Sequence, residues 1–161
     1  MKVKRSLGGR ALNGDDDPTL GWQWKLKLDN LSEGHNHLEC FSIARADELQ
    51  GIIVLTGPER CELAAHAGSM ALRIEYLETA PWNRRDLMKN PKFSGVGAVL
   101  VAASALKSTE LGHDGRLILD SIPAATAFYA RMGFEPVRYP SRLPNTRYEL
   151  TASEARRLLG D

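Results

Sequence analysis

Alternation of apolar and polar residues predicts β-strands in the first half of the chain. Segments over Leu38 to Arg45 and Leu49 to Thr56 flank the polar connector Ala46-Asp47-Glu48, which predicts an antiparallel hairpin. The second segment contains the continuous apolar run Ile52-Ile53-Val54-Leu55, which indicates burial on both faces of the strand. We expect Gly57-Pro58 to end this strand.

A third strand, predicted over Met70 to Thr79, carries two acidic side chains. Strict alternation divides its side chains between two faces, with Leu72, Ile74 and Tyr76 on one and Arg73, Glu75 and Leu77 on the other. Glu75 and Glu78 are therefore expected on opposite faces of this strand. Pro81 is expected to stop it.

An apolar period of 3.6 residues predicts a helix over Val96 to Leu111. Its stripe consists of Val96, Val99, Leu100, Ala103 and Leu106. Gly112 is expected just past its end. A short strand over Arg116 to Asp120 follows, so the strand, glycine turn, helix and strand predict a βαβ unit whose two strands are parallel.

The C-terminal third predicts three further elements and a final helix. Pro123 suits the first turn of a helix that Gly133 ends. Strands are predicted over Phe134 to Tyr139 and Thr146 to Leu150, joined by the loop Pro140 to Asn145. A capping box, Thr151-x-x-Glu154, then opens a short helix that runs through Leu159.

The N-terminal region is predicted to differ from the rest. Residues 1–18 have no apolar period and are expected to form a flexible arm, which leaves one domain over residues 19–161. Thr19 is expected to cap a helix that contains Trp22. The acidic run Asp15-Asp16-Asp17 and the pair in His35-Asn36-His37 lack further ligands at usable spacing, so no metal is expected there or elsewhere.

Composition narrows the class of protein without naming a function. The chain has 161 residues, 43% of them hydrophobic and 25% charged, as in a folded domain rather than a disordered or membrane segment. A net charge of +1 gives no electrostatic reason to expect nucleic acid or an anionic membrane as partner. Cys40 and Cys61 are expected to be reduced, and the lack of a secretory signal favours the cytoplasm.

The stretch Lys92-Phe93-Ser94-Gly95-Val96-Gly97-Ala98 joins a polar loop to the predicted long helix. Two glycines spaced by one residue let the backbone approach a ligand closely, and a helix start offers free N–H groups and a positive dipole end. The stretch therefore predicts an anion site, most simply for a phosphate or pyrophosphate. The preceding loop is basic through Arg84, Arg85, Lys89 and Lys92, which indicates either anion contacts or a solvated loop.

Two common glycine motifs do not fit this stretch. It lacks the Gly-Lys-Ser/Thr ending of a P-loop, and Leu100 stands where a dinucleotide fingerprint has its third glycine or alanine. It does resemble the central motif of the Gcn5-related N-acetyltransferases, Arg/Gln-x-x-Gly-x-Gly/Ala, with Lys92 in the first place. The second signature of that family, a strand and then a helix with an aromatic-Tyr pair and Gly-Phe, is matched by Leu117 to Ser121 followed by Ala125 to Phe134.

This resemblance covers the order of elements from Leu38 to Leu150. It implies an α/β fold (α+β in some schemes), with a mixed, mostly antiparallel sheet, a parallel βαβ splay and flanking helices. It also implies an acetyl-CoA-dependent N-acetyltransferase, in which the primary amine of a small molecule or peptide attacks the thioester directly. The partners would be acetyl-CoA and that amine, and the protein would be a monomer or a homodimer.

The resemblance also implies roles for individual residues. Tyr129 matches the position of the general acid, with a packed aromatic as the alternative. Glu75 is the favoured base, with Glu78 or a chain of waters as alternatives. The cofactor would be held by groups on both strands and the glycine loop: Leu77, Glu78, Thr79, Lys92, Phe93, Ser94, Gly95, Val96, Gly97, Ala98, Ser121 and Phe128.

The sequence departs from the family pattern in three places. The loop from Pro81 to Lys92 is longer than the usual connector, and Ser121-Ile122 replaces a frequent Asn before the Tyr129 helix. The first strand and paired helices that commonly build the acceptor pocket are not evident near the N-terminus. The acceptor is therefore left open, and a CoA-binding regulatory or structural module without turnover is the rival hypothesis.

Overall fold

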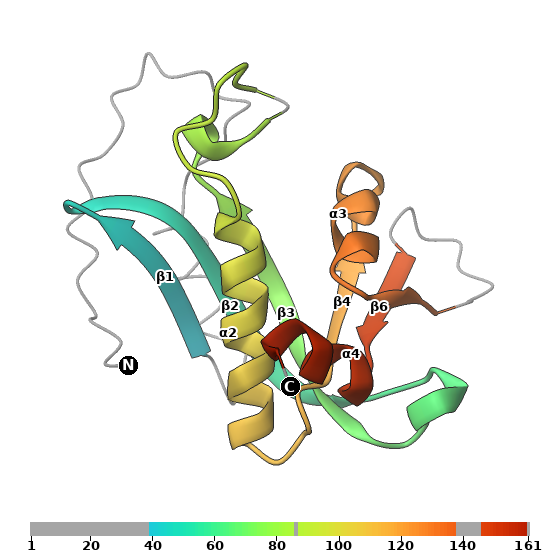
Figure 1. Ribbon diagram of the computed structural model, residues 1–161. Helices are drawn as coiled ribbons and strands as arrows, with labels where there is room; N and C mark the ends of the chain where they lie inside the picture. The colour runs from blue at the N-terminus through green and yellow to red at the C-terminus, as the bar shows by residue number, and fades with distance from the viewer. Residues whose placement is uncertain (1–38, 86, 138–145, 161) are drawn as a thin grey trace.

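A computed structural model describes residues 39–85, 87–137 and 146–160 (Figure 1). The expectations for the N-terminal arm, the helix that Thr19 caps, the His35-Asn36-His37 loop and the Pro140 to Asn145 loop lie outside these residues. The described strands are β1 Glu39–Arg45, β2 Glu48–Arg60, β3 Met70–Thr79, β4 Leu117–Ser121, β5 Glu135–Pro136 and β6 Thr146–Leu150. The helices are α2 Val96–Glu110, α3 Thr126–Arg131 and α4 Ala152–Leu159, with 3₁₀ turns η2 Ala64–His66, η3 Pro81–Asn83 and η4 Pro123–Ala125.

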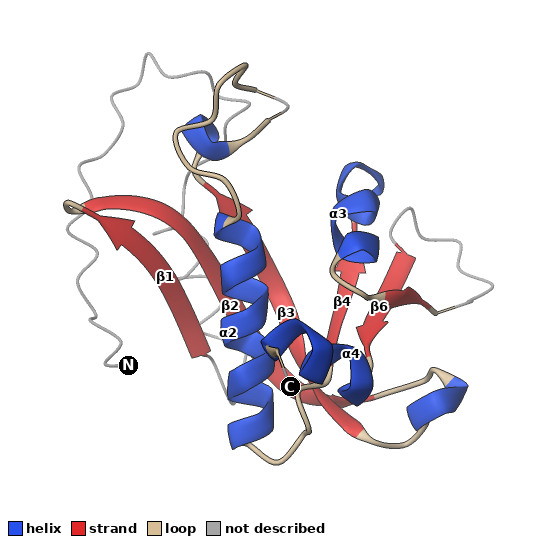
Figure 2. Cartoon of the chain, in the orientation of Figure 1, coloured by secondary structure: helices blue, strands red, loops and turns tan. Residues whose placement is uncertain are grey.

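The six strands form one mixed sheet in the order β1-β2-β3-β4-β6-β5 (Figure 2). Every neighbouring pair is antiparallel except β3 and β4, which are parallel because α2 lies between them in the chain. The apolar core lies between the sheet and α2 and includes Ile53, Leu100 and Leu119. The predicted α/β class, mixed sheet and parallel βαβ unit are confirmed.

The first hairpin forms as predicted, but its second strand is longer. β1 pairs with β2 from Glu39–Leu55 to Arg45–Glu48. β2 then passes through Gly57-Pro58 to Arg60, so the expectation that this dipeptide ends the strand was wrong. Proline has no N–H to donate to the ladder, and the register with β3 shifts between Thr56 and Glu59 before pairing resumes.

A β-bulge in β3 overturns the predicted division of its side chains. Val54 pairs with Tyr76 and Leu55 with Ile74, so Glu75 is an extra residue on this strand. After the bulge, Leu77 joins Ile74 on the face that packs against α2, whereas Tyr76 is exposed. The extra residue reverses the alternation of every side chain beyond it.

The two acidic residues of β3 were wrongly expected on opposite faces. Glu78 pairs with Ile52, two residues from Val54, and so points away from α2. Glu75 accepts a hydrogen bond at 2.9 Å from Nε of Arg73, its i−2 neighbour. Since Arg73 pairs with Thr56, it too lies on the face opposite α2. The bulge therefore brings both acids to one face of the sheet.

Helix α2 buries only part of the predicted stripe. Val96 and Leu100 are buried as predicted, whereas Val99 and Leu106 are 58% and 51% exposed. The buried face also includes Val101, Ser104 and Ser108, which were not predicted. These serines can be buried because their hydroxyls donate to backbone carbonyls, Ser104 to Leu100 at 2.9 Å and Ser108 to Arg116 at 2.7 Å.

The C-terminal elements agree with the sequence with two changes. Thr151 Oγ1 accepts from the N–H of Glu154 at 3.2 Å and caps α4, as the capping box predicts. The single helix predicted after Pro123 is a 3₁₀ turn followed by α3, and the described part of the Phe134 to Tyr139 strand is only β5.

Two further features of the described residues bear on the sequence analysis. Cys40 and Cys61 are both free; Cys61 is buried and Cys40 partly buried. Among the described helices, none combines the length and the apolar character that crossing a bilayer requires.

Candidate functional site

The parallel strands β3 and β4 meet only briefly and then separate. In the described chain their ladder consists of two residue pairs, Leu72–Leu117 and Arg73–Ile118. Figure 1 shows the strands diverging beyond these pairs, with the start of α2 on one side and α3 on the other. The opening between two parallel strands therefore lies beside a helix N-terminus.

Gly95 gives this helix start its shape. It is the N-cap residue of α2, with φ of +81°, a left-handed conformation that an L side chain adopts only at a cost. A Cβ built at this position would meet no heavy atom within 4 Å. Val99 N–H donates to the Gly95 carbonyl at 3.0 Å, so the N–H groups of residues 96–98 precede the first helical hydrogen bond. Those groups and the helix dipole suit an anion.

Gly97 lies against a ring of another helix, a contact that its spacing in the motif does not reveal. A Cβ at this position would lie 3.2 Å from Cζ of Phe128 and 3.6 Å from Cγ2 of Thr79. Phe128 belongs to α3, so this glycine makes room for a ring on the far side of the opening. The second glycine of the motif thereby couples the helix start to the helix that carries Tyr129.

The long loop before α2 is fixed by a buried amide network that the sequence analysis missed. Asn83 Nδ2 donates to Gln50 Oε1 at 2.9 Å and to the Gln50 carbonyl at 3.2 Å. Trp82 Nε1 also donates to Gln50 Oε1, at 2.9 Å. Asn83 Oδ1 in turn accepts from the N–H of Phe93 at 3.0 Å. This network anchors the start of the glycine stretch to β2.

No sequence signal could have identified this network. Gln50 and Asn83 are 33 residues apart and belong to no motif, so their contact depends on how β2 and the loop pack. Trp82-Asn83 suggested only the end of a strand. Both amide side chains are buried, and the hydrogen bonds satisfy groups that would otherwise be costly to bury.

Tyr129 lies in the core near the opening. It is 7% exposed, and its ring makes edge contacts with Phe128 and Phe134, with centroids 5.1 and 5.5 Å apart. Its hydroxyl makes no hydrogen bond to another residue of the described part of the chain. Burial raises the pKa of Tyr129 to about 12, so the phenol stays protonated at neutral pH and can donate.

The two candidate bases lie in different surroundings. The Glu75 carboxylate contacts Arg73, which also binds Asp120 of β4 and Glu59 of β2. Burial raises the pKa of Asp120, but the hydrogen bond and charge of Arg73, with those of Arg147, outweigh it and lower that pKa. Glu78 is partly buried and lies opposite Ile52.

Two basic side chains lie beside the ring of Phe93, and one of them is already paired. Lys92 Nζ binds the Glu48 carboxylate at 2.5 Å and lies 5.9 Å from the centre of the Phe93 ring. This hydrogen bond from Lys92 is the main reason why the pKa of Glu48 is lowered. The guanidinium of Arg45 lies over the same ring, 5.1 Å from its centre.

The remaining residues of the predicted cofactor set lie on three elements. Leu77 and Thr79 are in β3 beyond the bulge, on the face toward α2. Ser121 ends β4, and its buried hydroxyl donates to the carbonyl of Ile122 at 3.0 Å. Thr79 and Phe128 are brought together around Gly97, whereas Ser121 is engaged with its own neighbour.

The fold is that of solved Gcn5-related N-acetyltransferases. An acetyltransferase from Bacillus subtilis in complex with CoA is 20% identical, with a TM-score of 0.50 over 76% of this chain and 82% of that one. An acyl-CoA N-acyltransferase from Pseudomonas aeruginosa is 16% identical, with a TM-score of 0.55 over 84% and 81%. A mutant of the toxin AtaT, bound to acetyl-CoA and the C-terminus of the antitoxin AtaR, is 17% identical, with a TM-score of 0.57 over 91% and 87%.

At these identities the likeness concerns the fold. No protein-family model matches the sequence, and no curated protein matches it at a significant level. The expectation that the chain has the fold of this family is therefore confirmed by structure rather than by close relatives.

Proposed function

We propose that this protein is an acyl-CoA N-acyltransferase that moves an acetyl group from acetyl-CoA to a primary amine of a small molecule or peptide. The observation that carries the proposal is the left-handed Gly95 at the start of α2, which directs N–H groups to the mouth of a parallel-strand opening. Solved structures with this fold contain CoA or acetyl-CoA, which supports the choice of anion.

In this proposal the pyrophosphate binds the N–H groups of residues 94–98, near Lys92 and Phe93. The pantetheine arm runs along β3 at residues 77–79 and passes Ser121 and Phe128. Asn83 holds this loop in place, because its side-chain oxygen accepts from the N–H of Phe93. That N–H is therefore not available to the phosphate, and the N–H groups that follow it are kept in position.

The reaction requires two proton movements. The amine nitrogen attacks the thioester carbon, so a C–N bond forms and the C–S bond breaks. The attacking group is the neutral amine, because an ammonium has no lone pair; its nitrogen gives up one proton to a carboxylate or water as the amide forms, and the departing thiolate accepts one. Tyr129 is the proposed donor, and Glu75 or Glu78 the proposed acceptor, directly or through water.

Glu75, one of the two proposed proton acceptors, is held in an ion pair with Arg73. Arg73 fixes the Glu75 carboxylate on the face of the sheet opposite α2. Glu78 lies on the same face and is three residues closer to the glycine loop in the sequence. Replacing each by Gln in turn, with Glu59→Gln as the matched control, would show whether either loss lowers kcat.

Binding and turnover need separate experiments. Titration of CoA and acetyl-CoA by calorimetry should give saturable binding, and dephospho-CoA serves to test the 3′-phosphate. Release of the CoA thiol is then followed with a panel of amines, amino acids and peptides. Failure to bind either thioester or free CoA would contradict the proposal, whereas binding without turnover on any amine would favour the rival regulatory or structural module.

Tyr129→Phe tests the proposed acid. We expect kcat to fall by about 100-fold, within the range of general acid catalysis, with little change in the KM for acetyl-CoA. Because the pKa of Tyr129 is raised to about 12, its phenol gives the wild-type rate no falling limb below about pH 10. An unchanged kcat in a folded variant would mean that Tyr129 only packs, as its contacts with Phe128 and Phe134 also allow.

A further inference from the structure

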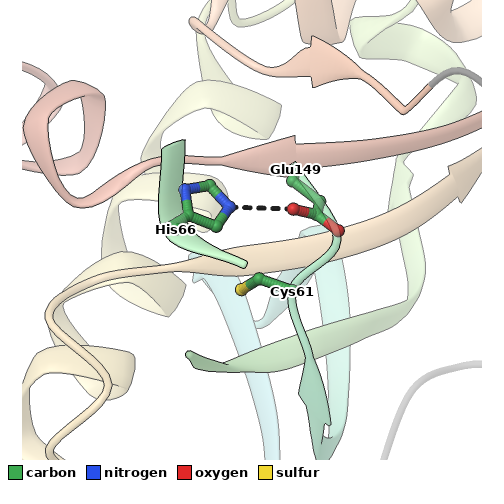
Figure 3. Close-up of side chains that lie close together, drawn as sticks. All are labelled: Cys61, His66 and Glu149. Atoms are coloured by element: carbon green, nitrogen blue, oxygen red, sulfur yellow. Dashed lines mark hydrogen bonds and ion pairs between the residues drawn. The ribbon is translucent and has the colours of Figure 1, made fainter. Parts of the chain in front are cut away.

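Three potential metal ligands from distant parts of the chain converge on the face of the sheet opposite α2. Cys61 follows β2, His66 ends the η2 turn and Glu149 lies in β6 (Figure 3). One ligand atom from each, sulfur, nitrogen and oxygen, lies within 4.8 Å of the other two. Cys61 is 3% exposed and Glu149 is fully buried, so the group is shielded from bulk solvent.

The surrounding backbone holds this group in place. The N–H groups of Glu62 and Leu63 donate to the two Glu149 oxygens at 2.8 and 3.1 Å. Two hydrogen bonds join the ends of the β2–β3 connection. The N–H of Cys61 donates to the carbonyl of Ser69 at 2.8 Å, and the N–H of Gly68 donates to the carbonyl of Cys61 at 3.1 Å. Two of the ligands thus come from one closed loop, and the third is fixed against that loop.

The arrangement does not fit a nucleophilic triad. Nε2 of His66 is 2.8 Å from Oε2 of Glu149, and Figure 3 shows the other ring nitrogen on the far side of the ring from Cys61. That nitrogen is buried and has no hydrogen-bond partner in the described chain, so it cannot take a proton from the thiol.

We propose that Cys61, His66 and Glu149 bind one divalent transition metal of the zinc class, with a solvent molecule as fourth ligand. Sulfur and imidazole ligands exclude the hard cations Mg²⁺ and Ca²⁺, and one Cys, one His and one carboxylate are all accepted by Zn²⁺. Tetrahedral bonds of about 2.0 to 2.3 Å put ligand atoms roughly 3.3 to 3.6 Å apart. The His66–Glu149 hydrogen bond at 2.8 Å must therefore open slightly and Cys61 must approach.

This site is independent of the proposed acyl transfer. Glu149 pairs with Ile118, which lies on the opposite face of β4 from the core residues Leu117 and Leu119. The metal would join the β2–β3 connection to β6, a structural role that cross-links segments 83 to 88 residues apart. No metal was expected from the sequence, where Glu149 lies far from Cys61 and His66 and the three residues form no motif.

The test uses the full chain without an expression tag, stripped by a chelator and reconstituted with Zn²⁺ or Co²⁺. We expect one equivalent of metal by elemental analysis, a rise in melting temperature that the chelator reverses, and a near-ultraviolet thiolate-to-cobalt band. Cys61→Ser should abolish the band and weaken Zn²⁺ binding at least about tenfold. Cys40→Ser is the matched control and should change neither.

A second control removes His35 and His37, which are not among the proposed ligands. A variant with His35→Ala and His37→Ala should keep the metal, and circular dichroism would check that each variant folds. Glu149→Gln keeps the shape of the side chain but should also lower affinity. The proposal is overturned if stripped protein takes up no metal and gains no stability from Zn²⁺, or if the cobalt band survives in folded Cys61→Ser.

Discussion

The glycine loop before α2 and the Cys61–His66–Glu149 group differ in how their polar groups are satisfied. At the start of α2 the N–H groups of residues 96–98 precede the first helical hydrogen bond, so they are available to a ligand. In the buried group, three donors already occupy the Glu149 carboxylate. The loop can therefore bind an anion without breaking an internal bond, whereas a metal must replace one.

The two regions also depend differently on side chains. The loop presents backbone groups, and its side chains matter mainly where they set the backbone, as Gly95 and Asn83 do. The buried group consists of side chains, so one substitution removes a third of its ligands. Five experiments, from the largest expected effect to the smallest, test this contrast.

Glu149→Ala should have the largest effect on stability. It leaves the N–H groups of Glu62 and Leu63 and the His66 ring without their buried partner, at a cost of about 3 to 5 kcal/mol in the free energy of unfolding. Urea denaturation with excess chelator isolates this term from any metal. Glu59→Ala, a half-exposed carboxylate on the same face, should cost less than about 1 kcal/mol. Equal costs would contradict the contrast.

Asn83→Ala should affect both stability and binding. It removes two hydrogen bonds to Gln50 and leaves the N–H of Phe93 without its acceptor, at a cost of about 1 to 3 kcal/mol. We expect CoA affinity, measured by calorimetry, to fall about tenfold, roughly 1.4 kcal/mol. Asn90→Ala, an exposed change in the same loop, should leave both unaltered.

Asn83→Asp separates the two effects of that side chain. An aspartate keeps an oxygen for the N–H of Phe93 but loses the donor to Gln50. It should lose stability while it keeps more of the CoA affinity than alanine does. If it binds CoA no better than the alanine variant, the role assigned to the Phe93 contact is wrong.

Gly95→Ala should cost about 1 to 2 kcal/mol, because the left-handed backbone disfavours any side chain there even though nothing blocks a Cβ. Gly112→Ala is a close control. Gly112 has φ of +82°, equally open space, and lies at the other end of the same helix. Both should lose similar stability, but only Gly95→Ala should weaken CoA binding. Equal affinities would remove Gly95 from the site.

Lys92→Met should have the smallest effect. This lysine is half exposed and already paired with Glu48, so we expect no measurable change in stability and about a threefold loss of CoA affinity that shrinks at high salt. Lys89→Met, an exposed change in the same loop, tests whether the effect is specific. The same loss for both variants would indicate a general charge effect rather than a contact at Lys92.

What could be predicted from the sequence follows from the range of the interactions. Helix α2 with its glycine ends, the hairpin and the Thr151 cap depend on neighbours within a few residues, and all were predicted. The parallel βαβ unit was predicted from the order of its elements in the chain. Gly95 adopts the left-handed conformation easily because it has no Cβ, so its importance could be predicted from the motif alone. The contact of Gly97 with Phe128 was not predicted, because it spans two helices.

The errors come from contacts between distant residues. The bulge at Glu75 is defined by the register with β2, so alternation within β3 could not reveal it. Ser104 and Ser108 lie on the buried face of α2, where only apolar residues were expected, because each hydroxyl donates to a backbone carbonyl. The Gln50–Asn83 network and the Cys61–His66–Glu149 group join residues that no local pattern relates.

The short ladder between β3 and β4 has a kinetic consequence. Because the described ladder holds only Leu72–Leu117 and Arg73–Ile118, the strands are already apart where an extended ligand would lie between them. Insertion there need not wait for strands to unzip, so association should follow a single bimolecular phase whose rate rises linearly with ligand concentration. Under the proposed function, acyl-CoA would bind where the two strands are already separate, without breaking a pair of the β3–β4 ladder.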